Sequence, residues 1–297
     1  MAREKAVHGR MQPGKAGISS YDIIGDIAII ELPRGSRAKP TDIAREIVRV
    51  HPRIKTVLAK AGSRSGEFRT RGFRKILGKE TETVHMEHGF RFRVDPTKVY
   101  FSPRESTERE RIASLVGPSE TVMVMFAGAG PYGIVIAGKQ PAVRRVYQVE
   151  INPRGFEYMK QNIAMNKLSH LVVPVPGDAR KVCGNYRRIC NRVVMPLPHG
   201  GYRFLGAAMR CLKKRGFIHF YSIGKTGKDS WGSSADQELF GPATRILEKA
   251  AGRLGRKVRI LNRKRVLPYG PGKWKICIDA EVITSAGGKT APEGSRK

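Results

Sequence analysis

The segment Met125 to Gly133, MFAGAGPYG, has glycines at Gly128, Gly130 and Gly133 in the spacing G-x-G-x-x-G. This spacing is typical of a turn between a strand and a helix, where backbone N–H groups approach a ligand that a Cβ would obstruct. Glu150 follows at the end of the next expected strand, where a carboxylate accepts hydrogen bonds from two ribose hydroxyls. We therefore expect an adenosine-containing cofactor, and a plain tight turn is the structural alternative.

Two further features favour one adenosine cofactor over another. Asp178 lies just after the third expected strand, where a carboxylate can accept from the adenine amino group. The fourth strand ends in Pro196-Leu197-Pro198, a rigid segment at the carboxyl end of the sheet, beside the cofactor crevice. A dehydrogenase needs neither, so S-adenosylmethionine is favoured over a nicotinamide. The expected cofactor-binding residues are Phe126, Ala127, Gly128, Gly130, Glu150, Ile151, Asp178 and Ala179.

The charge of the chain indicates its class of partner. With 56 Lys plus Arg against 25 Asp plus Glu, the formal net charge is +31. Such an excess favours a polyanion, above all a nucleic acid, because neutralised phosphates release condensed counterions. A solvated basic surface or networks of ion pairs is the alternative. No apolar run reaches the ~20 residues of a membrane span, and no signal peptide is evident, so we expect a cytoplasmic protein that does not bind membranes.

The N-terminal third predicts a small α+β domain. Residues 21–32 suggest a hairpin around Gly25-Asp26, and a helix after Pro40 would have Thr41 as its cap and bury Ile43, Ile47 and Val50. Arginines alternate with apolar residues in 67–78 and 80–95. This alternation predicts a row of arginines on one sheet face that could follow phosphates.

From about Arg104 helices and strands alternate, which predicts a parallel, doubly wound sheet. Residues 257–283 read as two strands around a Pro/Gly turn, an antiparallel hairpin at the sheet edge. The four cysteines form no C-x-x-C pair and are expected to be core thiols. The domains expected are a basic arm at 1–18, the α+β domain at 19–103, the larger α/β domain at 104–285 and a tail at 286–297.

Five segments in order carry a family resemblance: YFSPRESTERERI, MFAGAGPYG, VEINPRGFEYMKQNIAMNK, GDAR and IHFYSIG. From Tyr21 to Ile283 the chain resembles the archaeal and eukaryotic tRNA (guanine37-N1)-methyltransferases. The resemblance implies a class I S-adenosylmethionine-dependent methyltransferase domain, Rossmann-like, joined to a smaller α+β domain. It also implies methyl transfer to N1 of guanosine 37 in tRNA, held by its anticodon arm, and we expect a monomer.

The chain departs from this family in two ways. The further N-terminal domain that reads the tRNA elbow is expected to be absent, since only about 20 residues precede Tyr21. The usual Asn-Leu-Pro on the fourth strand is Pro196-Leu197-Pro198, so the amide for the target base is missing. In this the chain resembles an archaeal subgroup that also methylates C7 of 4-demethylwyosine, the tricyclic wyosine precursor, at the same position.

The resemblance also implies catalytic roles. Glu108 is the candidate base for the N1 proton, and Arg69 would stabilise negative charge on O6, with Arg71 as its rival. Pro196 and Pro198 complete the catalytic set, and Arg71, Arg104 and Tyr132 are expected to bind substrate. The pocket for the flipped base could be lined by Tyr132, Pro198 and Phe220.

Alternatives stay open at this point. Glu108 could be an exposed helix carboxylate paired with Arg111 or Arg104. The protein could be an NAD-dependent dehydrogenase, or a non-catalytic RNA-binding protein on a methyltransferase-like fold.

Overall fold

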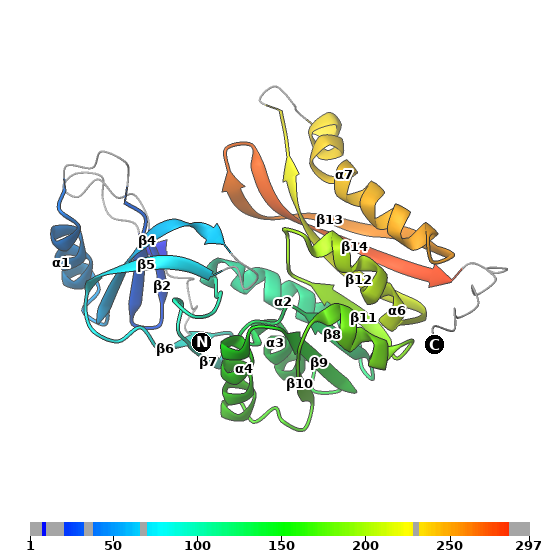
Figure 1. Cartoon of the computed structure of the whole chain (residues 1–297), viewed down its shortest axis with the longest axis horizontal. Coiled ribbons are helices and arrows are strands. Elements are labelled where there is room, and N and C mark those ends of the chain that lie inside the picture. The colour runs from blue at the N-terminus through cyan, green and yellow to red at the C-terminus, as the bar shows by residue number, and fades with distance from the viewer. Residues whose placement is uncertain (1–7, 10–20, 33–37, 66–69, 228–231, 285–297) are drawn as a thin grey trace, which may run out of the picture. The chain divides into compact units, whose positions relative to one another are not determined.

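The computed structural model describes residues 8–9, 21–32, 38–65, 70–227 and 232–284 (Figure 1). The chain divides into two units that interleave in sequence. Unit 1 comprises Met1–Leu115, Ala127–Lys139 and Ile151–Pro176, and unit 2 comprises Val116–Phe126, Gln140–Glu150 and Gly177–Lys297. Most of the expected N-terminal arm and all of the expected tail at 286–297 lie outside the described residues. His8 and Gly9 form the short strand β1, which pairs with β2.

Unit 1 contains a five-stranded sheet with the order β1-β2-β3-β4-β5. Its strands after β1 are β2 (Tyr21–Ile24), β3 (Ile27–Ile30), β4 (Thr56–Ser65) and β5 (Thr70–Leu77). The expected hairpin is confirmed: β2 and β3 pair antiparallel around Gly25, whose φ of +57° suits a residue without a Cβ.

Helix α1 (Pro40–Val50) packs on this sheet through Ile43 and Ile47, as predicted. Two details of the prediction were wrong. The cap position is Lys39 and not Thr41, because Pro40 occupies the first helical position, where its missing N–H costs nothing. Val50 is 45% exposed, since it is the last residue of the helix, beyond the turn that meets the core.

A separate two-stranded sheet, β6 (Thr83–Glu87) and β7 (Phe90–Val94), follows in unit 1. The predicted row of arginines is therefore split between two sheets: Arg71 lies on β5, and Arg91 and Arg93 on β7. Alternation along β7 holds, since Phe92 and Val94 are buried and the two arginines exposed.

The outer edge of β7 is bonded to asparagines of helix α4 (Pro153–Met165) and the residue after it. Asn166 accepts from the N–H of Arg91 (2.9 Å) and donates to its carbonyl (2.7 Å). Asn162 does the same for Arg93, at 2.7 and 3.0 Å. Two amide side chains, one helical turn apart, thus occupy the positions of a third strand.

The rest of unit 1 consists of η1 (Pro103–Glu105), α2 (Ser106–Ser114), α3 (Pro131–Lys139), α4 and β10 (Val172–Pro176). Helix α3 contains Gly138 for a packing reason. A Cβ there would lie 2.1 Å from the ring of Phe90 on β7, so any larger residue would force that ring to move.

The larger sheet has the strand order β10-β9-β8-β11-β12-β14-β13. Its other strands are β8 (Thr121–Met125), β9 (Arg145–Glu150), β11 (Cys190–Met195), β12 (Leu212–Lys225), β13 (Arg256–Gly270) and β14 (Lys273–Thr284). Strands β9, β8, β11 and β12 pair in parallel, and β14 pairs antiparallel with β12 and β13. The predicted parallel sheet with an antiparallel edge hairpin is confirmed, and its order reverses between β8 and β11, where such sheets bind ligands.

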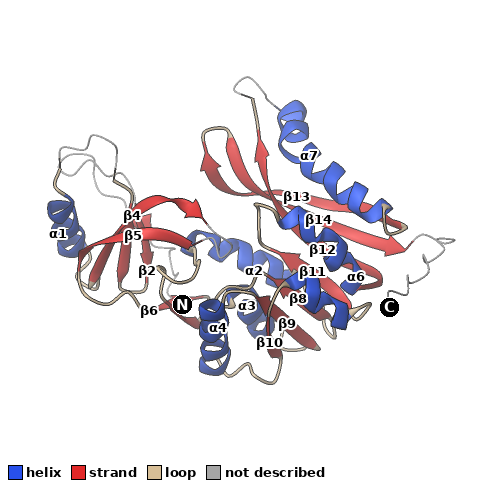
Figure 2. Cartoon of the chain, viewed as in Figure 1, coloured by secondary structure: helices blue, strands red, loops and turns tan. Residues whose placement is uncertain are grey.

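Unit 2 also contains α5 (Ala179–Val182), η2 (Cys183–Tyr186), η3 (Gly201–Phe204), α6 (Leu205–Cys211) and α7 (Gly232–Gly252). Helix α7, which contacts β12, β13 and β14, was not predicted (Figure 2). Its sequence contains Gly241 and Pro242, residues that usually interrupt helices. All four cysteines are buried thiols that form no disulfide, as predicted. Among the described residues no helix has the length and apolar character of a membrane span.

Candidate active site

The glycine loop follows β8 and leads into α3. Phe126, Gly128 and Gly130 have φ of 58°, 57° and 84°, a left-handed path that glycine adopts readily and phenylalanine rarely does. The Gly130 N–H donates to the Ala127 carbonyl at 2.9 Å, which closes the turn. Within unit 1, a Cβ on Gly128 would be 3.4 Å from the carbonyl oxygen of Tyr100, so the loop packs closely on the segment before α2.

The carboxyl ends of β8 and β9 are neighbours in unit 2. Met125 pairs with Val149, which places the next residues, Phe126 and Glu150, at the same edge of the sheet. Glu150 is 8% exposed. Its carbonyl accepts from the Gly177 N–H at 2.9 Å, and this bond brings the start of α5 next to the end of β9.

Asp178 caps helix α5. Its Oδ1 accepts from the Arg180 N–H at 2.8 Å, and its Oδ2 accepts from the Arg180 guanidinium at 2.7 Å. Hydrogen bonds from Arg180 hold the pKa of the Asp178 carboxyl below its usual value, so the group is ionised at neutral pH. Ala179, the first residue of α5, is buried.

Aromatic rings lie beside these carboxylates in unit 2. Phe126 and Phe204 meet edge to face with centroids 4.8 Å apart, and the Arg180 guanidinium lies 5.0 Å from the centre of the Phe204 ring. Neither Phe204 nor Arg180 was predicted. Arg180 was within reach of prediction through the GDAR segment, whereas Phe204 belongs to a short 3₁₀ turn with no distinguishing pattern.

In unit 1, Ile151 is half-buried at the start of the connection to α4. The next residue, Asn152, caps that helix by accepting from the Arg154 N–H at 3.0 Å, and its amide donates to the Lys98 carbonyl at 3.1 Å. This cap fixes the chain directly after Glu150, and an Asn before a Pro at a helix start is the signal that could have identified it.

The loop after β11 starts with a tight turn. The Leu197 N–H donates to the Met195 carbonyl at 2.8 Å, which makes Pro196 the centre of a three-residue turn that suits its fixed φ. Pro196 and Pro198 are both half-buried. Phe220, expected as a wall of the base pocket, is only 1% exposed, and it lies within β12 opposite Ile278.

Glu108 lies on α2 and is 5% exposed. Arg111, one turn later, donates from Nε to Oε2 and from Nη2 to Oε1, each at 2.7 Å. The alternative interpretation is thus correct about the partner and wrong about exposure, because Glu108 is buried. Arg104 does not pair with Glu108: its Nε donates to Asp22 of β2 at 2.5 Å.

A second buried carboxylate, Glu105, was not predicted. It accepts hydrogen bonds from Tyr100 (2.7 Å) and Tyr132 (3.4 Å). Tyr132 is 4% exposed, so its ring is part of the packing between α3 and the start of α2. Arg109, also buried, forms a two-pronged ion pair with Glu87 and donates to the Ser102 carbonyl at 2.9 Å, which fixes the YFSPRE segment to β6.

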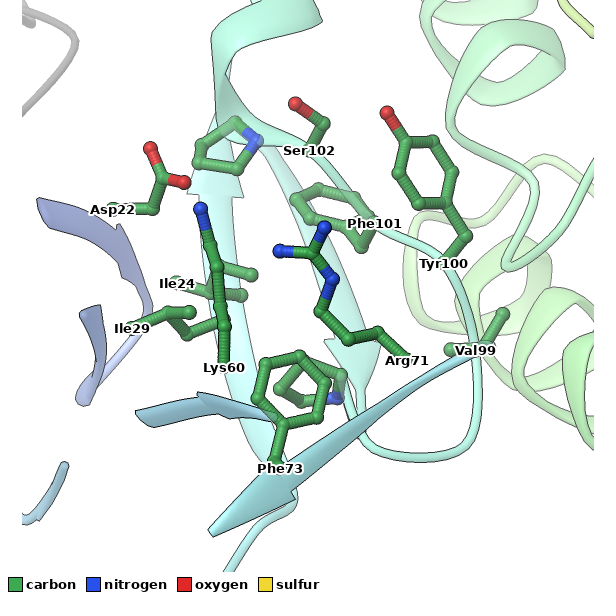
Figure 3. Close-up of a pocket in the computed structure, with 12 residues that line it drawn as sticks. Asp22, Ile24, Ile29, Lys60, Arg71, Phe73, Val99, Tyr100, Phe101 and Ser102 are labelled. Atoms are coloured by element: carbon green, nitrogen blue, oxygen red, sulfur yellow. The ribbon is translucent and has the colours of Figure 1, made fainter. Parts of the chain in front are cut away.

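A pocket of unit 1 opens in front of this segment (Figure 3). Arg71 of β5 and Lys60 of β4 extend into it: the Arg71 guanidinium lies beside Phe101, and the Lys60 side chain runs toward Asp22. The Nε of Arg71 is buried with no hydrogen-bond partner among the described residues, while Lys60 pairs with Glu31 at 3.0 Å. Arg69, the other arginine considered, lies outside the described residues.

This pocket brings together groups that suit a nucleotide. The aromatic side chains offer stacking surfaces, and the cations can contact a base oxygen or a phosphate. The structure therefore places Arg71, one of the predicted substrate residues, in the same pocket as Tyr100, and it puts Glu108 on the helix that begins shortly after this segment.

Comparisons with known proteins agree with this geometry. The pattern of the TRM5/TYW2 methyltransferase domain matches residues 83–258, and that of the TYW2 N-terminal domain matches residues 12–81. Pyrococcus abyssi tRNA (guanine(37)-N(1))-methyltransferase Trm5b is 37% identical, over 89% of this chain and 75% of its own. The tRNA(Phe) (4-demethylwyosine(37)-C(7)) aminocarboxypropyltransferase of Methanocaldococcus jannaschii is 32% identical, over 88% and 97%.

A third relative carries both names in one protein. The tRNA (guanine(37)-N(1))/4-demethylwyosine(37)-methyltransferase Taw22 of Nanoarchaeum equitans is 30% identical, over 69% of this chain and 84% of its own. Curated relatives thus span methyl and aminocarboxypropyl transfer at position 37 of tRNA.

Solved structures show the same fold. The structure of P. abyssi Trm5b matches with a TM-score of 0.78 at 36% identity, covering 91% of this chain and 76% of that one. The structure of M. jannaschii TYW2 in complex with AdoMet matches with a TM-score of 0.68 at 26% identity, covering 89% and 100%. These matches confirm the predicted fold class, a methyltransferase sheet with a smaller N-terminal α+β part. The chain belongs to the TRM5/TYW2 family of methyltransferases.

Proposed function

We propose that this protein transfers a methyl group from S-adenosylmethionine to N1 of guanosine 37 in tRNA, bound through the anticodon arm. The observation that carries the proposal is the buried pair of Glu108 and Arg111 on α2, in a chain 37% identical to Trm5b. Removal of the N1 proton requires a positioned proton acceptor, and a buried, oriented carboxylate can serve as one. The dehydrogenase and non-catalytic alternatives lose support, since the relatives are named as transferases.

The residues at the carboxyl ends of β8 and β9 fit S-adenosylmethionine. The left-handed loop from Phe126 to Gly130 leaves room where side chains would otherwise stand, and Glu150 can accept from ribose hydroxyls. Asp178 can accept a hydrogen bond from the adenine amino group in addition to the one that its carboxylate accepts from Arg180. When bound, the sulfonium supplies an electrophilic methyl group, and Ile151 and Ala179 complete the apolar surroundings of this proposed site.

The chain's own residues then position the base and remove its proton. Glu108 accepts the N1 proton, because a carboxylate oxygen that already accepts a hydrogen bond from Arg111 can still accept a proton. Arg111 holds the carboxylate in one orientation, which limits the search for a productive geometry. Arg71 donates to O6 and stabilises the negative charge that grows there as N1 is deprotonated.

A second candidate reaction is methylation of C7 of 4-demethylwyosine at the same position. Pro196 favours it, because a proline offers the target base no side-chain amide and ties the pocket less strictly to guanine. The similarity to Taw22, whose name includes both substrates, supports it as well. The match to the TYW2 N-terminal domain keeps aminocarboxypropyl transfer as a further outcome to be tested.

One experiment separates these reactions. The protein is incubated with S-adenosylmethionine and either unmodified tRNA or tRNA carrying 4-demethylwyosine, and the nucleosides are analysed by mass spectrometry. We expect 1-methylguanosine from the first substrate. The mass added to the tricycle distinguishes a methyl from an aminocarboxypropyl group, and no change in either tRNA would refute the proposed function.

A further inference from the structure

The edge hairpin of unit 2 has an unusual charge. From Arg256 to Lys275 there are eight Lys and Arg residues and no Asp or Glu. Part of this charge is matched by carboxylates from elsewhere: Arg259 pairs with Glu281 at 2.7 Å, and Arg265 with Asp236 of α7 at 2.8 Å. Arg256 is held as well, since it donates to the Leu212 carbonyl at 2.9 Å.

Three exposed lysines lie on one face of this hairpin and of β12. The register places Lys225 opposite Lys273 and Lys264 opposite Cys277. Side chains along a strand point alternately to the two faces of the sheet, so residues 273, 275 and 277 of β14 lie on one face. Their direct partners on β12 and β13 lie on the same face. We name Lys225, Lys264 and Lys273 the lysine face. In the part of the chain that the structure describes, none of the three pairs with a carboxylate.

The opposing pair Lys225 and Lys273 is informative in itself. Like charges directly opposite each other on neighbouring antiparallel strands destabilise the sheet. A polyanion bound at this face would remove that repulsion. The other face cannot serve in the same way, since Arg265 lies there beside α7, which covers it.

The hairpin also contacts the loop that carries Pro196 and Pro198. His199 Nε2 lies 2.9 Å from the Tyr269 hydroxyl, and the two rings are 5.1 Å apart between centroids. Tyr269 of β13 is 39% exposed and follows Lys264 by five residues. A strand of RNA that entered the loop at Pro196 would therefore meet this hairpin next.

We propose that the lysine face binds the sugar-phosphate backbone of the tRNA beside nucleotide 37, as a second contact surface in addition to the site that holds the base. This inference rests on the proposed function. Lysine ammonium groups contact phosphates as point charges, without sequence preference, so the face sets affinity and register and not the choice of base.

The test compares two triple variants of the full chain that remove the same charge. Lys225→Gln/Lys264→Gln/Lys273→Gln removes the lysine face, and Arg245→Gln/Lys249→Gln/Arg253→Gln removes three exposed cations of α7 and the turn after it. tRNA binding is measured from low to high salt. Each phosphate contact contributes roughly 0.7–0.9 to the slope of log Kd against log salt. Loss of three contacts in the first variant should therefore lower this slope by about two to three. At about 0.1 M salt its binding should weaken roughly tenfold or more.

The α7 variant should keep the wild-type slope. Equal slopes for the lysine-face variant and the wild type would overturn the inference, as would an equal fall in both variants, which would indicate a general effect of net charge. S-adenosylmethionine binding, measured by calorimetry, should be the same in all three proteins and shows that they are folded. Methyl transfer by the wild type is followed in parallel: its absence, with salt-dependent tRNA binding retained, refutes the proposed function and leaves the lysine face standing.

Discussion

Arg111 donates two hydrogen bonds to the carboxylate of Glu108 from one helical turn away, each at 2.7 Å, and Glu108 is 5% exposed. An ion pair this well formed is usually structural. Here it also orients the oxygens of the proposed base. A substitution that keeps the shape of the Glu108 side chain should slow methyl transfer if Glu108 is the base, and should leave the rate unchanged if the pair is only structural.

Glu108→Gln should slow the chemical step by roughly 10²–10⁴-fold, because an amide cannot accept the N1 proton. Single-turnover rates at saturating S-adenosylmethionine measure this step. Glu110→Gln, on the same helix with Glu110 48% exposed, is the matched control and should retain the wild-type rate. A wild-type rate in Glu108→Gln would mean that the pair only stabilises α2.

Arg71→Ala should lower kcat more than it weakens tRNA binding, since charge on O6 grows only as the proton leaves. The control is Arg74→Ala on the same strand, where the side chain is exposed. If Arg71→Ala changes only tRNA affinity, Arg71 is a phosphate contact and the catalytic role passes to Arg69.

Asp178→Ala should weaken S-adenosylmethionine binding by about 1–3 kcal/mol, roughly 5- to 150-fold, because the adenine amino group loses its acceptor. Asp178→Asn should bind more tightly than Asp178→Ala, since an Asn carbonyl accepts the same bond and also caps α5. Isothermal titration of the two variants decides the point, and identical affinities would remove Asp178 from the site.

Pro196→Asn should shift the substrate preference toward guanosine, because an amide at this position can hydrogen-bond the base. The readout is the ratio of rates on unmodified tRNA and on tRNA with 4-demethylwyosine. Pro198→Ala, two residues later, introduces no amide and should leave that ratio unchanged. A ratio that does not move in Pro196→Asn would show that Pro196 does not govern selection.

Stability should fall between about pH 6.5 and pH 4 because of His85. Burial lowers its pKa from 6.5 to about 4, and its neutral Nδ1 accepts from the Gly25 N–H at 3.2 Å. In this range the unfolded chain binds the proton and the folded chain does not, so the stabilisation is full above pH 6.5 and is lost on acidification. The effect is at most on the order of 3 kcal/mol.

Urea unfolding at pH 7 and pH 4.5 measures this loss. His85→Asn keeps an acceptor that does not titrate, so the difference in unfolding free energy between the two pH values should shrink. His170→Gln, which removes an exposed histidine, should leave the difference as it is. An unchanged difference in His85→Asn would assign the acid sensitivity to other groups.

The sequence predicted best what depends on local pattern. The glycine loop, the alternation of strands and helices and the terminal hairpin follow from turn residues and periodicity, and the structure has them where expected. Helix α7 was missed because Gly241 and Pro242 weaken its helical propensity, which packing against three strands overcomes.

The site was predictable only in part, since burial and partners arise from tertiary packing. No pattern in STERER shows that Glu108 is buried or that Arg111 and not Arg104 is its partner. Tyr132 and Phe220, expected at a pocket wall, are buried in packing instead. Phe204 and Glu105 became visible only when the fold brought distant segments together.

The asparagines that complete β7 make its hairpin depend on a remote part of the chain. Their bonds to Arg91 and Arg93 span 75 and 69 residues. The outer edge of β7 therefore gains these side-chain partners for its backbone only after α4 has formed. Contacts this distant in sequence form slowly during folding. A fragment ending at residue 103, the boundary expected from sequence, would leave the β7 edge open to pairing with a second molecule. The smaller domain therefore depends on the methyltransferase sequence for protection against self-association.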